Sequence, residues 1–379
     1  MIYFLVNNNY HLIDALSQVE NLNSDEVSLI TVNHTLDITK EHEKIFTEIF
    51  TFNKAIEKSV DYINIRKSIK NKKAIKNGLN SINHHDVIFF YAELELQNHY
   101  IVELFKTRGA QVFLIEEGLA TYITFFSEEK IKKYKTKALI KEILIRYVLL
   151  YKNSRVRKNV DFDIVTIRDQ LIDGALFFGD VKNNQREIKT YTIEKNCLIL
   201  DKTEEAAVIF LNQDIYAIYV SFDEYLYVLN DILCNLANNF KKVYFKFHPR
   251  ENEEIRSKIK ENIKSIDSIS FIKSNHPIEN DIEKLSIKNA CSFMSNSLLN
   301  LSHQGINPIF VIHKYENLSK DKTLNDCIAI LEVMGYDFFQ EWSDLKRINN
   351  AFFINKAKKY TTDINYLSFH QEADHTNLK

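Results

Sequence analysis

The chain has 379 residues, of which 45% are hydrophobic and 26% charged. This length predicts about two domains, and this composition excludes an intrinsically disordered chain. The net charge of −2 excludes a general attraction to nucleic acid, so we expect no nucleic-acid partner. The sequence holds no uninterrupted run of about 18 apolar residues, which a membrane-spanning helix would need.

The cysteines and the first residues indicate a cytoplasmic protein. The four cysteines have neither the Cys-x-x-Cys nor the Cys/His spacing of a zinc site, so we expect reduced thiols and no metal. The opening residues, MIYFLV, are apolar, but they are too few for a secretion signal and lack a basic lead. We expect them to form a first strand.

Strand and helix patterns alternate along the first half, which is typical of a Rossmann-like domain. We expect strands over residues 2–6, 27–32, 86–91 and 111–115, and helices over 10–19, 40–50, 62–77 and 95–107. A basic and partly apolar segment over 128–158 should pack on this domain as a long helix. The chain has no Gly-x-Gly-x-x-Gly fingerprint, which disfavours a nicotinamide cofactor.

The second half repeats the alternation and predicts a second Rossmann-like unit. We expect strands over residues 197–200, 207–212, 243–247, 269–273, 290–294 and 308–313, and helices over 222–239, 251–264, 279–287, 297–304, 319–334 and 343–359. The polar, turn-rich segment 180–195 is the expected linker.

We therefore predict an α/β protein with the GT-B layout, in which two Rossmann-like domains face each other across a cleft. The expected boundaries are 1–185 for the acceptor-side domain, 195–340 for the nucleotide-binding domain, and 341–379 for a helix that crosses back and a tail. Open α/β sheets bind ligands beyond the carboxyl ends of their strands, so the residues that follow the predicted strands are the candidate site.

The first candidate motif is Glu116-Glu117-Gly118, which follows the predicted strand 111–115. A strand end here delivers two carboxylates, and the glycine allows a sharp turn. One carboxylate can accept the proton of an attacking hydroxyl group. The alternative interpretation is structural, because acidic residues are common before the first turn of a helix.

The second candidate motif runs from Lys246 to Glu251 and contains His248-Pro249-Arg250. The proline stiffens the turn after the strand, and the imidazole can then protonate or hydrogen-bond a leaving phosphate. Lys246 and Arg250 add positive charge for the same phosphate. The dipeptide also occurs at His276-Pro277, and a surface histidine at a strand end is the structural alternative.

A third candidate motif is Ser295-Asn296-Ser297, at the start of the predicted helix 297–304. Hydroxyl groups and backbone N–H groups at a helix N-terminus can bind a phosphate. The same residues can also serve as an ordinary helix cap, and the two roles are compatible.

Taken together, the motifs resemble those of the bacterial polysialyltransferases and the related lipooligosaccharide sialyltransferases. The resemblance rests on Glu-Glu-Gly-x-x-Thr-Tyr at 116–122, Lys-x-His-Pro-Arg-Glu at 246–251, Pro-Ile-Glu at 277–279 and Ser-Asn-Ser at 295–297, in this order. It implies an inverting, metal-independent GT-B sialyltransferase that uses CMP-sialic acid as donor substrate and needs no cofactor.

The resemblance also implies residue roles. Glu117 matches the general base with Glu116 as its neighbour, and His248 matches the residue that assists departure of the CMP phosphate. Ser295 and Ser297 match residues that hold this phosphate, and Glu279 matches the acid that binds the ribose hydroxyls. The donor-binding set is completed by Gly118, Pro249, Arg250 and Asn296.

The sequence departs from the family pattern in two places. Asn296 replaces a hydroxyl residue, and Phe247 stands where a proline is frequent. In the lipooligosaccharide branch the base lies elsewhere, and Asp214 is the alternative base in this chain.

Basic segments at 66–76 and 130–158 suggest contact with an anionic surface. Lys70, Lys72 and Lys73 are the expected contacts with an acceptor glycan or with the inner membrane. The structural alternative is an ordinary solvated face.

The sequence therefore predicts a transferase that moves sialic acid to a bacterial capsule or lipooligosaccharide acceptor, in the cytoplasm, with peripheral contact to the inner membrane. Two other functions stay open: a teichoic-acid-type polyol phosphate transferase that uses a CDP donor, and a catalytically silent sugar-nucleotide-binding or assembly protein. The acceptor, the linkage, the number of sugars added and the oligomeric state are not fixed by the sequence, because acceptor pockets are built from loops.

Overall fold

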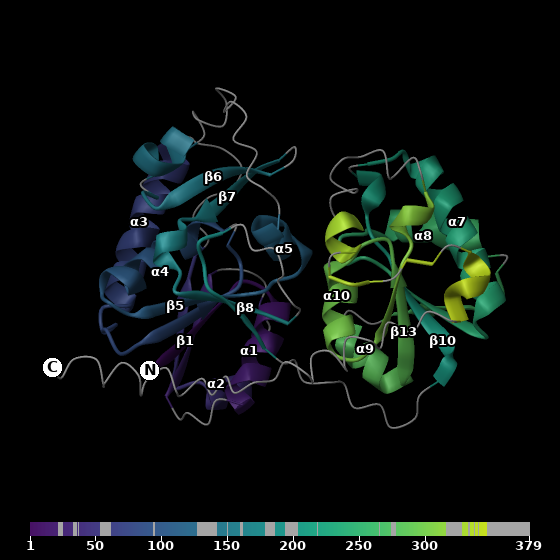
Figure 1. Cartoon of the computed structure of the whole chain (residues 1–379), viewed down its shortest axis with the longest axis horizontal. Helices are drawn as coiled ribbons and strands as arrows, with labels where there is room; N and C mark the ends of the chain where they lie inside the picture. Colours follow the sequence, from purple (N-terminus) through teal and green to yellow (C-terminus); the bar gives the residue numbers. More distant parts are fainter. Residues whose placement is uncertain are drawn as a thin grey trace. The chain divides into compact units, whose positions relative to one another are not determined.

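The structure, a computed structural model, divides into two units after Ile193, and each is described by itself (Figure 1). It describes residues 1–21, 26–32, 36, 38–53, 62–93, 95–126, 142–149, 151–159, 162–178, 186–193, 204–217, 219–264, 266–273, 278–315, 328–332, 334–336, 338–339 and 341–346. The predicted strand 197–200, His276-Pro277 and most of the C-terminal segment 341–379 lie outside these residues.

The first unit is built on a seven-stranded parallel sheet of order β3-β2-β1-β4-β5-β8-β9. Its strands are β1 (Ile2–Val6), β2 (Val27–Val32), β3 (Glu48–Phe52), β4 (Val87–Phe90), β5 (Gln111–Ile115), β8 (Gly174–Phe177) and β9 (Thr190–Thr192). From β1 the chain adds β2 and β3 on one side of the sheet. It then crosses back to the other side of β1, where it adds β4, β5, β8 and β9. The carboxyl ends of β1 and β4 therefore form a topological switch point, where open α/β sheets bind ligands.

Helices cover both faces of this sheet (Figure 1). They are α1 (Asn9–Asn21), α2 (His42–Ile45), α3 (Tyr62–Gly78), α4 (Leu96–Thr107) and α5 (Leu119–Phe126), with a π-helical turn η1 (Leu144–Val148) and a 3₁₀ turn η2 (Asp169–Leu171). The period-2 alternation of β1 explains the arrangement: Phe4 packs in one cluster with Leu12 of α1, whereas Tyr3 contacts the ring of Phe105 of α4. Strands covered on both faces are apolar throughout, as the sequence of β1 shows.

Three predictions for the first unit are wrong in part. The predicted helix 40–50 is the four-residue α2 followed by β3, which extends the sheet at its edge. The predicted long helix over 128–158 ends in a strand, because β6 (Ser154–Asn159) pairs antiparallel with β7 (Phe162–Ile167). The expected linker 180–195 includes β9, which pairs with β8 and so belongs to the first unit.

The second unit has a five-stranded parallel sheet of order β12-β11-β10-β13-β14. Its strands are β10 (Glu204–Leu211), β11 (Lys242–Lys246), β12 (Ile269–Ile272), β13 (Ile287–Ser292) and β14 (Asn307–Phe310). Its helices are α7 (Phe222–Asn239), α8 (Glu253–Ile263), α9 (Ile278–Leu285) and α10 (Asn296–His303), with 3₁₀ turns η3 (Ile215–Ala217), η4 (Ile312–Lys314) and η5 (Trp342–Lys346). The switch point lies between β10 and β13.

Sequence signals explain most of these boundaries. Ser221 caps α7 by accepting the N–H of Glu224, and Asn252 caps α8 by accepting the N–H of Ile255. The sheet is buried against α7 by a cluster that includes Phe210, Phe245 and Leu229. The second Rossmann-like unit is thus confirmed, with β13 starting three residues earlier than predicted.

Candidate active site

Glu116 and Glu117 follow β5 at the carboxyl edge of the first sheet, and their side chains have different surroundings. Glu116 is fully buried, and its Oε2 accepts the Tyr122 hydroxyl at 2.5 Å and the Phe178 N–H at 2.9 Å. These bonds tie the ends of β5 and β8 to α5. The expected catalytic role of Glu116 does not fit this burial, because a substrate cannot reach its side chain.

Glu117 keeps 29% of its side chain exposed. Its N–H donates to Thr121 Oγ1 at 3.1 Å, and the next residue, Gly118, has φ of 138°, a conformation that favours glycine. The turn thus sends α5 away from the sheet and leaves the Glu117 carboxylate at the sheet edge. This placement fits the predicted general base, and the Gly118 conformation shows why a glycine stands here.

His11 of α1 contacts this carboxylate, and this contact was not predicted from the sequence. Its Nε2 lies 3.2 Å from Glu117 Oε1, and its ring stacks on Tyr91 with centroids 4.8 Å apart. His11 is fully buried and lies at the switch point between β1 and β4. A polar Asn-Asn-Asn-Tyr-His run directly after a buried strand was the available signal, because switch-point residues follow such strands.

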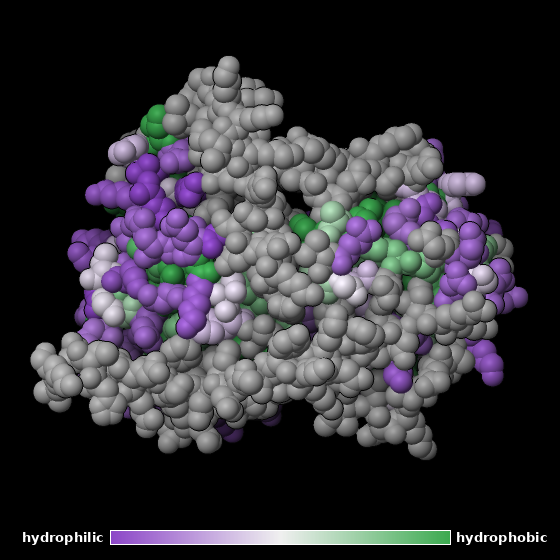
Figure 2. All heavy atoms as spheres, in the orientation of Figure 1, coloured by the Kyte–Doolittle hydropathy of each residue, from purple (hydrophilic) through white to green (hydrophobic). Residues whose placement is uncertain are grey.

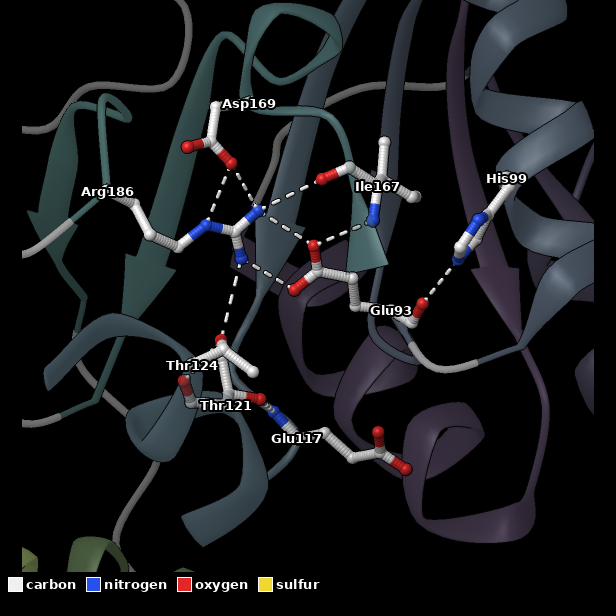
Figure 3. A network of polar contacts seen from close by, with 8 residues as sticks. All are labelled: Glu93, His99, Glu117, Thr121, Thr124, Ile167, Asp169 and Arg186. Carbon is white, nitrogen blue, oxygen red and sulfur yellow. Dashed lines mark hydrogen bonds and ion pairs between the residues drawn. The ribbon is translucent and has the colours of Figure 1, made fainter. Parts of the chain in front are cut away.

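Behind α5, Arg186 forms a buried ionic network (Figure 3). Its guanidinium donates to Glu93 at 2.7 and 2.8 Å and to Asp169 at 2.7 and 3.0 Å. It also reaches Thr124 Oγ1 at 3.5 Å, and Thr124 in turn donates to the Thr121 carbonyl. Figure 3 shows Glu117 extending away from this network, toward the purple helix α1. The network therefore supports the turn at the start of α5. Arg186 forms ion pairs with Glu93 and Asp169, and the Glu117 carboxylate points away from them.

In the second unit, Asp214, His248 and Arg250 come together beyond β10 and β11. His248 Nδ1 lies 3.7 Å and Arg250 Nη1 3.8 Å from the Asp214 carboxylate. Burial lowers the pKa of His248, the Asp214 carboxylate raises it, and Arg250 lowers it. Arg250 keeps 79% of its side chain exposed, so its charge is available to an anionic ligand.

Glu251 holds this loop in place and was not expected to do so. Its carboxylate accepts the His248 N–H at 2.8 Å and the Asn212 side-chain amide at 2.7 Å, and Asn212 also accepts the Tyr225 hydroxyl. Glu251 is buried, and burial raises its pKa to about 7. One carboxylate thus joins the residues that follow β10 to those that follow β11.

The residues after β13 complete the switch-point edge of this unit. Ser295 caps α10 by accepting the Ser297 N–H at 3.1 Å, as the structural interpretation predicted, and Asn296 is the first residue of the helix. Gln213 Oε1 accepts the Met294 N–H at 2.8 Å and so ties β10 to this turn. A helix N-terminus therefore lies at the switch point with its first turn capped.

Two predicted residues of the donor site lie on or beside α9. Lys246 pairs with Asp281 of α9 at 2.5 Å, and its contact with a phosphate stays a prediction. Glu279 is in the first turn of α9. Pro249 lies in the turn closed by the Glu251 N–H and the His248 carbonyl, at 3.0 Å.

Comparison with known proteins places this arrangement in a family. The family model described as alpha-2,8-polysialyltransferase matches residues 2–312, which cover both motif-bearing units. The chain belongs to the alpha-2,8-polysialyltransferase family. No curated protein sequence matches the chain.

Solved structures show the fold of this polysialyltransferase-family protein. A protein assigned as a UDP-N-acetylglucosamine 2-epimerase from Listeria monocytogenes has a TM-score of 0.51 at 8% identity, covering 96% of this chain and 97% of that chain. A glycosyltransferase from Rickettsia africae matches at a TM-score of 0.47 and 11% identity, covering 98% and 97%. A glycosyltransferase of Glycyrrhiza uralensis, UGT73P12, matches at 0.48 and 9%, covering 98% and 94%. The predicted α/β fold with parallel sheets is confirmed, and the family match confirms the predicted glycosyltransferase class.

The basic residues of α3 in this family member differ in exposure. Lys70 and Lys73 are exposed, whereas Lys72 is buried and donates to the Leu149 carbonyl at 2.6 Å. Lys72 also lies 3.6 Å from the centroid of the Tyr151 ring, and burial lowers its pKa to about 8. The expected surface contact of Lys72 is therefore wrong; this lysine ties η1 to α3.

Two further features concern metals and membranes. The expectation from the sequence that no Asp-x-Asp metal motif occurs is wrong, because Asp161-Phe162-Asp163 is such a tripeptide. Asp161 lies outside the described residues, and in the part that is described no three His, Cys, Asp or Glu side chains form a metal-binding group. Among the described helices, none is both long and apolar enough to cross a membrane.

Proposed function

We propose that the protein transfers sialic acid from CMP-sialic acid to the hydroxyl group of a bacterial surface glycan, with inversion at the sialyl carbon. The observation that supports this most is the family match over 2–312, which covers a base candidate and a phosphate-binding candidate, each at the carboxyl edge of its own sheet.

Glu117 is the general base in this mechanism. Its carboxylate accepts the proton of the acceptor hydroxyl while the oxygen attacks the sialyl carbon, and the bond from that carbon to the CMP phosphate oxygen breaks. The partial exposure of Glu117 supports this role, because an acceptor can approach its free edge. Asp214 is the alternative base, but its neighbours His248 and Arg250 fit a carboxylate that holds cationic groups.

The second unit receives the CMP leaving group. His248 donates a hydrogen bond or a proton to the departing phosphate, and exposed Arg250 adds a positive charge. The N–H groups at the start of α10, with Ser295, Asn296 and Ser297, bind the same phosphate, and Glu279 binds the ribose hydroxyls. These groups supply positive charge and hydrogen-bond donors to the leaving group, so the mechanism we propose uses no metal ion.

An exposed surface of the first unit fits contact with the inner membrane. Ile69 of α3 and Ile143 and Tyr147 at η1 are 52%, 45% and 64% exposed, and Lys72 ties these two elements together. Lys70 and Lys73 are exposed on the same helix as Ile69, and Figure 2 shows hydrophobic surface beside hydrophilic side chains at the upper left, above the place where Figure 1 labels α3. Exposed apolar groups among lysines suit an anionic lipid surface.

The test of the reaction is release of CMP from CMP-sialic acid by the purified protein, with and without a chelator, across galactosyl and sialyl acceptors. We expect turnover with one acceptor class, and loss of at least about 100-fold in kcat for Glu117→Gln and His248→Ala. Thr107→Ala is the control, because Thr107 ends α4 just before the start of β5 and so lies at the edge of the sheet opposite Glu117.

Other outcomes would replace the proposal. Turnover of CDP-glycerol without turnover of CMP-sialic acid would establish a polyol phosphate transferase. Full activity of Glu117→Gln with loss in Asp214→Asn would move the base to the second unit. Activity abolished by the chelator and restored by a divalent cation would contradict the metal-independent mechanism.

A further inference from the structure

We propose that His11 is a positioning residue that holds the Glu117 carboxylate in the orientation needed to accept the acceptor proton. The inference rests on the proposed function, because it assumes that Glu117 is the base. His11 is fully buried, so it acts through Glu117 and does not touch the substrate.

The Asn7 N–H and the Glu117 carboxylate together favour the tautomer of His11 that has its hydrogen on Nε2. The Asn7 N–H points at Nδ1 at 3.2 Å, so Nδ1 accepts a hydrogen bond. Nε2 then carries the hydrogen and donates to Glu117 Oε1 at 3.2 Å. Asn8 Nδ2 also lies 3.1 Å from Nε2, but in this tautomer the two N–H groups face each other as donors, so Asn8 makes no hydrogen bond to the ring.

The imidazole itself is fixed on several sides. Its ring stacks on Tyr91 at an interplanar angle of 10°, and the Tyr91 hydroxyl donates to Asp14 of the same helix at 2.9 Å. Asn7 exchanges two side-chain hydrogen bonds with Asn98 at the start of α4. These contacts join α1 to the residues that follow β4. They fix the direction in which the Nε2–H bond of His11 points.

This geometry has a chemical consequence for Glu117. A neutral N–H donor orients one carboxylate oxygen without placing a full positive charge beside it, so the other oxygen stays free to accept a proton. A glutamate without this partner has several rotamers at the sheet edge, and few of them direct an oxygen at a bound hydroxyl. Loss of such orientation costs about 100-fold in rate when reacting atoms shift by about 1 Å.

Two variants of His11 distinguish orientation of the Glu117 carboxylate from a role of His11 in packing alone. In His11→Gln the amide nitrogen can take the place of Nε2 and still donate to Glu117, whereas the bond from Asn7 is lost. In His11→Asn the amide oxygen can take the place of Nδ1 and still accept from Asn7, whereas the donor to Glu117 is lost. Both variants lose the stack on Tyr91, so a purely structural role predicts equal effects.

The experiment measures kcat and KM for CMP release with a saturating donor, beside thermal unfolding of each variant. We expect His11→Asn to lower kcat by about 100-fold with little change in KM for the donor, and His11→Gln to keep most of the activity. Equal losses in the two variants, or a loss that follows the unfolding temperature, would overturn the inference.

A double variant distinguishes failure of this inference from failure of the proposed base. If His11 acts through Glu117, His11→Asn adds little further loss in a Glu117→Gln background. Independent, multiplicative losses would contradict the inference while leaving Glu117 as the base. If Glu117→Gln is fully active, the proposed base itself is wrong.

Discussion

At the scale of single residues, the structure separates neighbouring side chains of the same chemical type. Glu116 is buried on Tyr122 and Phe178, whereas Glu117 reaches the sheet edge and His11. On α3, Lys72 is buried, whereas Lys73 is exposed. The residue type therefore defines which chemistry is available. The burial and partners of each side chain define which of two neighbouring residues of that type can contact a ligand.

The pH dependence of His248 is a prediction at this scale. Burial lowers the pKa of His248 below its ordinary value, the Asp214 carboxylate partly offsets this, and Arg250 lowers the pKa further. If protonated His248 assists the leaving phosphate, kcat/KM falls as the pH rises through this pKa. Removal of the carboxylate in Asp214→Asn should therefore move the alkaline limb to lower pH, and Arg250→Ala should move it to higher pH.

The measurement is the pH profile of kcat/KM for the parent protein and both variants. Bound donor adds phosphate charge beside the imidazole, so the alkaline limb of kcat should lie at higher pH than that of kcat/KM. Shifts in the same direction in both variants would contradict the role of His248 as the titrating group.

At the scale of elements, buried polar residues tie together segments that are far apart in the sequence. Glu251 joins the ends of β10 and β11, Gln213 joins β10 to the turn before α10, and Arg186 joins α5, β7 and the end of β4. Such connections position loops, and in each unit they lie at the carboxyl edge of the sheet.

Arg186 gives a prediction about stability. Arg186→Ala leaves the buried carboxylate of Glu93 and the partly buried carboxylate of Asp169 without their counter-charge, so the first unit should lose about 3–5 kcal/mol of unfolding free energy. Denaturant unfolding of the first unit, followed by a probe within it, measures this loss. Arg66→Ala on the exposed face of α3 is the matched control and should change stability by less than about 0.5 kcal/mol. A similar small effect in both variants would show that the network does not support the unit.

At the scale of the whole molecule, the surface formed by Ile69, Ile143 and Tyr147 gives a prediction about membrane contact. The full chain should sediment with vesicles of phosphatidylcholine and phosphatidylglycerol, and much less with phosphatidylcholine alone. Lys70→Glu with Lys73→Glu should weaken this binding by about 1 kcal/mol for each lysine or more, and added salt should weaken it further.

A matched control distinguishes binding through this surface from non-specific binding of vesicles to any exposed apolar side chain. Changing Ile69, Ile143 and Tyr147 to serine should reduce vesicle binding, whereas Tyr227→Ser should not, although Tyr227 of α7 is also highly exposed. Equal binding to neutral and anionic vesicles, or equal effects of the two serine variants, would exclude this surface as the membrane contact.

The sequence by itself determined the two Rossmann-like units and the positions of the three motifs at strand ends. Both follow from local information, because an apolar run ending in polar residues reports a buried strand and its carboxyl end. Short or edge elements such as β3 and β9 were missed, since their patterns are too brief to distinguish from neighbouring helix or loop.

Only the tertiary structure decided which side chains meet. His11 reaches Glu117, and Glu251 joins Asn212 to His248, because the strand order of each sheet brings distant segments to one edge. Burial then set Glu116 and Lys72 apart from their exposed neighbours. The spacing of residues in a motif encodes neither the order of strands in a sheet nor which of two adjacent residues is buried. The sequence therefore predicted which residue types could act, and only the fold showed which side chains contact one another.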